Sequence, residues 1–167
     1  MLSERLEAAR REGEGLENLT FEDEVWDALQ GQRMDYDRIR FIRCQFDACD
    51  LTGADFRNCL FDGCDLSGSS LTGCFFKQCE LRDCRGVGTD FRNSHLKTTR
   101  LLGCTMPYAN FSEAVLEDTL MSGGTFRQAS FMKAAFRKAK LERVDLQGAE
   151  FFQTPLKGID VSSCQIE

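Results

Sequence analysis

The residues of this 167-residue chain that could do chemistry are nine cysteines, one histidine (His95) and many carboxylates. Two sets of cysteines recur at 20-residue intervals, namely Cys44, Cys64, Cys84, Cys104 and the pair Cys59, Cys79. Such a ladder could suggest metal or redox chemistry. The favoured interpretation is structural, because free cysteine is often a small buried hydrophobe and the ladder has no histidine or other base beside it.

Known catalytic signatures are missing from the sequence. It contains no phosphate-binding loop, no dinucleotide fingerprint and no metal-ligand spacing. Repeated outward carboxylates usually form a solvated face. The sequence therefore predicts no catalytic residue, no bound metal and no cofactor.

A five-residue period organises the chain from Phe41 to its end. Stepping by five from Phe41 to Ile166, every residue except Gly86 is Phe, Leu, Met, Val or Ile. All nine cysteines lie two residues before one of these positions, and the other residues there are mostly Ala, Ser or Thr. The remaining positions are largely polar. We call the apolar residue that recurs at every fifth position, starting with Phe41, the central residue of its pentad.

The period of five excludes a helix and requires corners. In an extended segment, residues two apart share a face, so the small and the central residue both point inward. A corner in each pentad must restore that direction, and four right-angle corners close a square of about 20 residues. Squares stack through parallel ladders, with right-handed winding expected. We predict an all-β, right-handed quadrilateral parallel β-helix over residues 36–167, with a core that includes Phe41, Phe61, Phe91, Phe111, Phe131 and Phe151.

Several pentads resemble the repeat unit of the pentapeptide-repeat family. Examples are the segments that begin at Ala54 (ADFRN), Cys64 (CDLSG) and Ala109 (ANFSE). The resemblance covers about 130 residues and implies a right-handed quadrilateral β-helix. Some members imitate duplex DNA, bind DNA gyrase or topoisomerase IV and confer quinolone resistance. The projecting loops that some resistance members need are absent here, because the five-residue phase never breaks.

Both ends of the repeat need a cover. Residues 1–35 keep the phase only in part and are expected to form a capping segment, with a helix over about 4–12 capped by Ser3 and with Trp26 packed on the first coil. No cap is visible after Gln165. The two interpretations are a homodimer through the C-terminal coil and a chain cut short of its natural terminus.

Gly86 interrupts an inward column. One interpretation is a bulge or hinge that reshapes the surface around it. The other is a packing defect filled by a neighbour such as Met106.

Charge bears on the choice of partner. The net charge is −6, of which residues 1–40 carry −5, so the rod is nearly neutral. Charge mimicry of DNA would have to use the N-terminal half, with Asp47, Asp50, Asp62 and Asp65 as the acidic patch. Direct nucleic-acid binding is not expected at a pI near 4.9. The N-terminus lacks a secretory signal and no apolar run could span a membrane, so a cytoplasmic protein is expected.

A second surface combines apolar and basic residues. Phe75, His95 and Val115 recur in one outward column, and Lys77 and Lys97 lie in the next column on the same face. We call these five residues the apolar–basic strip. Exposed apolar patches often mark interfaces. The sequence thus favours a non-enzymatic rod that binds another protein, with a gyrase or topoisomerase IV ligand as the alternative.

Overall fold

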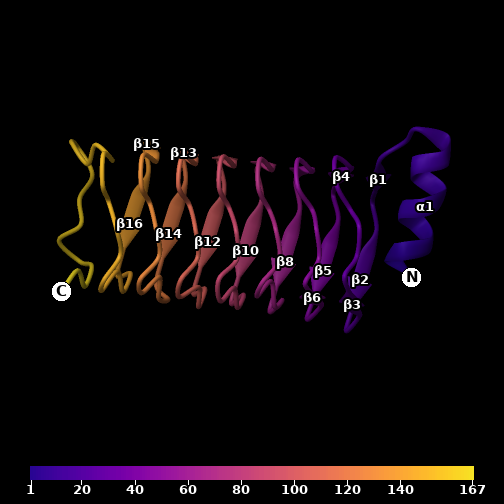
Figure 1. The fold of residues 1–167 in the computed structure, drawn as a ribbon, viewed down its shortest axis with the longest axis horizontal. Helices are drawn as coiled ribbons and strands as arrows, with labels where there is room; N and C mark the ends of the chain where they lie inside the picture. Colours follow the sequence, from indigo (N-terminus) through magenta and orange to yellow (C-terminus); the bar gives the residue numbers. More distant parts are fainter.

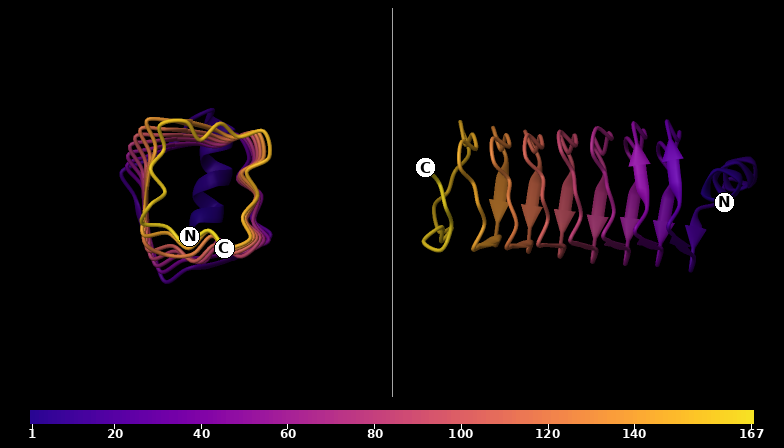
Figure 2. Two further views of the ribbon diagram at one scale, coloured as in Figure 1. Left: turned by 90° about the vertical axis from the view of Figure 1, so that its left-hand side faces the viewer. Right: turned by 90° about the horizontal axis from the view of Figure 1, so that it is seen from below.

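The computed structural model describes all residues 1–167, which coil into a four-sided rod behind one N-terminal helix (Figure 1). Viewed along the rod, the coils superimpose as a square (Figure 2). Each pentad is a short extended segment followed by a corner, and partners in adjacent coils are 20 residues apart, as in the pairing of Phe41 with Phe61. The fold class expected from the sequence is confirmed.

The first face is a parallel seven-stranded sheet. Its strands are β1 (Leu16–Glu17), β4 (Asp35–Asp37), β7 (Asp55–Arg57), β9 (Phe75–Lys77), β11 (His95–Lys97), β13 (Val115–Glu117) and β15 (Ala135–Arg137). The second face is a parallel sheet of the same size. Its strands are β2 (Thr20–Glu22), β5 (Arg40–Ile42), β8 (Leu60–Asp62), β10 (Glu80–Arg82), β12 (Arg100–Leu102), β14 (Leu120–Ser122) and β16 (Lys140–Glu142).

The other two faces are less regular. The third face begins with the pair β3 (Val25–Asp27) and β6 (Gln45–Asp47) and continues as single parallel bridges such as Asp65 with Arg85. The fourth face consists only of such bridges, from Gln30 with Asp50 to Ser130 with Glu150. The first and second faces are therefore the two that carry continuous backbone pairing along the rod.

The corners have a backbone requirement that the pentad pattern did not reveal. From Phe41 to Leu156, the residue two positions after each central residue adopts the left-handed conformation, as at Asn58, Gly63 and Thr98. Glycine and asparagine adopt this conformation easily, whereas a β-branched residue such as Thr98 (φ 49°) is strained there. The repeated corner keeps all central residues pointing inward.

The interior consists of stacked columns of central residues. Five of the six expected core phenylalanines are no more than 1% exposed, the exception being Phe151 near the C-terminal end, which is half-buried. Phe91, Phe111 and Phe131 lie ring on ring, with centroid distances of 4.6 and 5.1 Å. Burying each such ring contributes roughly 1.5–3 kcal/mol, so these columns are the main source of stability.

The N-terminal segment departs from its expected boundaries. Helix α1 (Leu2–Glu12) starts two residues before the expected residue 4, and Ser3 lies inside it and not at its cap. The Glu24 carboxylate accepts the Leu2 N–H at 3.4 Å and the Trp26 Nε1–H at 2.9 Å, which anchors the start of the helix to the first coil. Its 11 residues are too few and too polar to cross a membrane.

The solenoid also begins one coil before the expected boundary at residue 36. β1 starts at Leu16 and pairs with β4, so a complete coil lies inside the segment assigned to the cap. Its small inward positions carry Leu19, Glu24, Leu29 and Met34 instead. Leu29 and Met34 are buried, and Leu2 and Leu6 of α1 are buried at the same end of the rod. Larger side chains thus fill the end of the core beneath the helix.

Two glycines occupy central positions, and neighbouring side chains fill the space in both cases. A Cβ on Gly31 would lie 2.6 Å from Leu51 Cδ2 and 2.8 Å from the Tyr36 hydroxyl. A Cβ on Gly86 would lie 3.0 Å from Met106 Cγ. The filled defect is therefore the correct interpretation of Gly86, and its φ is not in the left-handed region that a special turn would need.

Candidate functional site

The structure brings the five residues of the apolar–basic strip together on the first face. Phe75 pairs with His95 and His95 with Val115 in adjacent strands, and Lys77 lies beside Lys97. The first column starts with Asp35 and Asp55 and ends with Ala135. The strip therefore occupies the middle and C-terminal part of the face.

Contacts within the strip hold its aromatic part in place. The Phe75 and His95 rings meet edge to face at 5.3 Å. His95 Nε2 lies 2.9 Å from Glu117 Oε2, and this contact joins the first column of the face to the second. The His95 side chain is 35% exposed, and Phe75 and Val115 are half-buried. The result is a flat, semi-exposed apolar surface on a rigid sheet.

The second column supplies positive charge. Arg57 is paired with Asp55 at 2.8 Å, whereas Lys77, Lys97 and Arg137 have no carboxylate within 4.0 Å. Glu117 lies between Lys97 and Arg137, but its carboxylate bonds to His95. That bond, together with the charges of Lys97 and Arg137, lowers the pKa of Glu117. Three cations of this column thus remain available to a ligand.

The four residues of the expected acidic patch do not share a face. Asp62 ends β8 on the second face, and Asp47 and Asp65 line a small hollow on the third face. Asp50 lies on the fourth face, where it accepts hydrogen bonds from Gln32 and the Thr52 backbone, and bonds to Thr52 help lower its pKa. Asp65 is within 4.0 Å of Arg85. The negative charge therefore winds around the rod and is partly neutralised.

The cysteines are all free, and every one except the half-buried Cys164 is buried. Their thiols donate to main-chain carbonyls 23 residues earlier, as from Cys74 to Leu51 O (3.0 Å) and from Cys64 to Phe41 O (3.1 Å). Hydroxyls at equivalent positions do the same, including Ser69 to Phe46 O (2.6 Å). Burial raises the pKa of the Cys74 thiol to about 12, and no group of three metal-ligating side chains is present.

Sequence reasoning missed these hydrogen bonds. The signal was available, because Ser69, Thr89, Thr99 and Thr119 share the pentad position of the cysteines. A position that accepts Cys, Ser and Thr as well as Ala needs a small side chain and often uses a donor.

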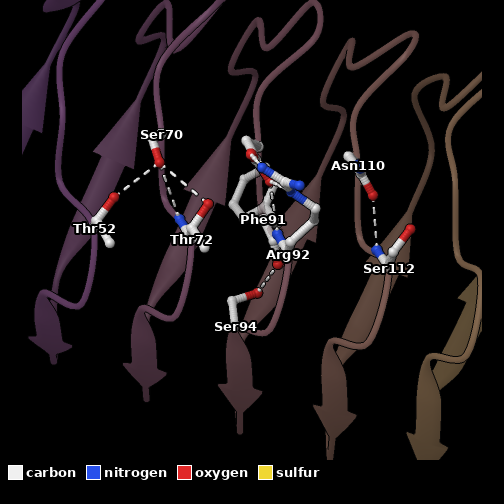
Figure 3. A network of polar contacts seen from close by, with 9 residues as sticks. Thr52, Ser70, Thr72, Phe91, Arg92, Ser94, Asn110 and Ser112 are labelled. Carbon is white, nitrogen blue, oxygen red and sulfur yellow. Dashed lines mark hydrogen bonds and ion pairs between the residues drawn. The ribbon is translucent and has the colours of Figure 1, made fainter.

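The fourth face carries a separate polar network (Figure 3). Ser70 Oγ lies 3.0 Å from Thr52 Oγ1, and Ser112 Oγ lies 2.9 Å from Ser130 Oγ. Arg92 forms an ion pair with Asp90, two residues earlier in the same coil. These groups satisfy one another along the stack, whereas the first face carries unpaired cations beside an aromatic cluster.

The repeat model of the pentapeptide repeat region matches residues 38–100, 54–131 and 87–151, which together cover most of the chain. This chain belongs to the pentapeptide-repeat family. A comparison of its sequence with curated proteins gives no match.

Solved structures of other pentapeptide-repeat proteins are similar to this one. Full-length QnrB1, a plasmid-mediated fluoroquinolone resistance protein, is 24% identical with a TM-score of 0.40, and the match covers 92% of this chain and 93% of QnrB1. HetL of Nostoc sp. strain PCC 7120, involved in heterocyst differentiation regulation, is 19% identical with a TM-score of 0.38, covering 87% and 88%. A protein of the Arabidopsis thaliana thylakoid lumen is 18% identical with a TM-score of 0.33, covering 84% and 70%.

Proposed function

We propose that this pentapeptide-repeat protein is a non-enzymatic, cytoplasmic interaction rod that binds another protein through the apolar–basic strip. The observation that carries the proposal is the combination of half-buried Phe75 and Val115 with the unpaired Lys77 and Lys97 on one flat sheet. Interfaces typically join an apolar centre to a polar rim, and the strip has both. The sheet is rigid, so little ordering cost opposes binding.

Replacement of strip residues tests this proposal. Phe75→Asp combined with Val115→Asp should abolish capture of the partner by immobilised protein, because the apolar contact is replaced by buried charge. The matched control is Leu60→Asp with Leu120→Asp on the second face, where both leucines are also half-buried strand residues. Equal capture by wild type and the strip variant would exclude the strip as the interface.

The alternative partner is DNA gyrase or topoisomerase IV, bound by imitation of DNA. The acidic N-terminal segment favours it, since residues 1–40 alone carry a net charge of −5. The distribution of Asp47, Asp50, Asp62 and Asp65 over three faces gives it less support than the strip has. A supercoiling assay with purified gyrase decides between the two: no inhibition and no protection from a quinolone would reject the topoisomerase function.

A homodimer through the C-terminal coil is also proposed. Phe151, Leu156 and Val161 are only half-buried there, and Ile166 is 47% exposed. Packing this end against a second copy would bury those side chains. Val161→Asp should then shift a dimer to monomer in sedimentation velocity, and a wild-type monomer at high protein concentration would refute the dimer.

A further inference from the structure

The spacing of side chains along the strip restricts the shape of a partner. Phe75, His95, Val115 and Ala135 stand in adjacent strands, so they repeat at ~4.8 Å along the rod axis. A helix lying along that axis advances about 5.4 Å per turn, a mismatch of roughly 0.6 Å per step and about 2 Å over the three steps. An extended chain repeats its same-face residues every ~6.6 Å, which accumulates a mismatch of about 5 Å. The strip therefore matches a helix.

The sheet itself offers no site for an added strand. β9 pairs with β7 and β11, and β11 pairs with β9 and β13, so the backbone groups at the strip are already used. A partner must contact side chains only. Each face is about three extended residues wide, or ~10 Å, which is about the diameter of one helix.

The charge of the strip indicates the charge that a partner segment must carry. Lys77, Lys97 and Arg137 are unpaired in the second column of the face. A second copy laid apolar column on apolar column, with its axis reversed, would set Lys97 against its own copy and Arg57 against Arg137, and only Lys77 would meet a carboxylate, that of Glu117. The column carries three unpaired cations and one carboxylate that is already bonded to His95, so an acidic partner complements it better than a second copy does.

We propose that the strip binds an acidic amphipathic helix of a partner protein, lying along the rod axis. Its apolar residues, spaced i, i+4, i+7 and i+11, pack on the four residues of the column from Phe75 to Ala135, and carboxylates along one flank meet Lys77 and Lys97. This inference rests on the proposed function and specifies the chemistry of its partner.

The first test uses a fluorescein-labelled designed peptide of about 20 residues, with leucines at those spacings and glutamates on one flank, in an anisotropy titration. The control peptide has lysine in place of each glutamate. The acidic peptide should bind in a salt-dependent manner, and Lys77→Glu with Lys97→Glu should weaken binding at least about tenfold, as should Phe75→Asp. Arg40→Glu with Leu60→Asp, a neighbouring basic and apolar pair on the second face, should leave it unchanged.

Three results would overturn the inference: equal binding of the two peptides, unchanged binding by the strip variants, or strip-dependent binding of a single-stranded oligonucleotide in place of the peptide. A second measurement separates its failure from that of the proposed function. With p-benzoylphenylalanine at position 75, illumination in cells that naturally contain the protein should cross-link it to an acidic helical segment, identified by mass spectrometry. A cross-link to a protein segment of other chemistry rejects the helix alone, whereas no cross-link and no peptide binding reject both.

Discussion

Replacing Phe111 with alanine probes the physical basis of the rod. Its ring stacks on Phe91 at 4.6 Å and on Phe131 at 5.1 Å, with interplanar angles of 3° and 6°, and the residue is fully buried. Phe111→Ala deletes a fully buried ring and leaves a cavity between the rings of Phe91 and Phe131. Loss of transfer energy plus the cavity should cost about 4 kcal/mol.

Phe151→Ala is the matched control, because the same column continues there with a single ring neighbour. Phe151 stacks on Phe131 at 5.2 Å and is half-buried. Half the burial and one stack in place of two predict a cost of about 2 kcal/mol.

Guanidinium unfolding followed by far-ultraviolet circular dichroism measures both costs. Trp26 at the N-terminal end provides a second probe, because unfolding of a repeat array can lose its cooperativity when a middle coil is weakened. Equal costs for the two variants, or a cost below about 1 kcal/mol for Phe111→Ala, would refute the stacked-column account.

Three further predictions follow from the same geometry. Thr98→Gly should stabilise the fold by about 1 kcal/mol in the same unfolding assay, because it relieves a β-branched residue at φ 49°, whereas Thr105→Gly, where φ is not positive, should destabilise it. The buried thiols should resist alkylation in the native state, and mass spectrometry should show that Cys164 reacts first. Burial raises the pKa of the Cys74 thiol from about 9 to about 12, so as the pH rises this thiol loses its proton in the unfolded chain before it does so in the folded one. The free energy of unfolding should therefore fall between pH ~9 and ~12. Leu6→Asp places a charge under α1 and should shift Trp26 fluorescence to the red, while Glu7→Ala on the exposed side of the helix should not.

The core of the rod could be predicted residue by residue because each central residue sees the same environment. One face of an extended triplet points inward in every pentad, so the pentad phase alone assigns Phe41 and Phe111 to the interior. The phase fails at the first coil, where Leu29 and Met34 replace small residues because a helix and not another coil covers them. Gly31 shows the same limit, since its volume is supplied by Leu51 of the next coil and by Tyr36 of a neighbouring column.

The corner conformation and the acceptors of the thiol hydrogen bonds could not be predicted from the pattern, for a different reason. Many residue types tolerate the left-handed corner at a modest cost, so Arg43 or Asp118 gives no sequence signal where Gly63 does. The direction of a Cys or Ser hydrogen bond depends on a carbonyl 23 residues away. Such a contact crosses both a coil and a corner, and no single pentad contains both partners.

The columns of the strip followed from the 20-residue period, but the pairing within it did not. Period predicts that His95 lies between Phe75 and Val115, and the structure agrees. Whether Glu117 bonds to Lys97 in its own column or to His95 across the face depends on side-chain rotamers. The choice of His95 leaves Lys97 free, and that free charge is the feature on which the partner proposal depends.

The architecture itself explains why the family fold says so little about partners. In this rod an outward residue has neighbours two positions away along its strand and 20 positions away along the stack, so a binding surface must be built from residues dispersed in sequence. Changing the first column from Asp35 and Asp55 to Phe75 and Val115 alters the surface without touching the inward residues between them, because each strand presents its two outward positions independently of its central one. Stability and recognition are thus separated within each three-residue strand. Substitutions at outward positions of the first face should change binding while leaving the free energy of unfolding within about 0.5 kcal/mol, and the central residues should behave in the opposite way.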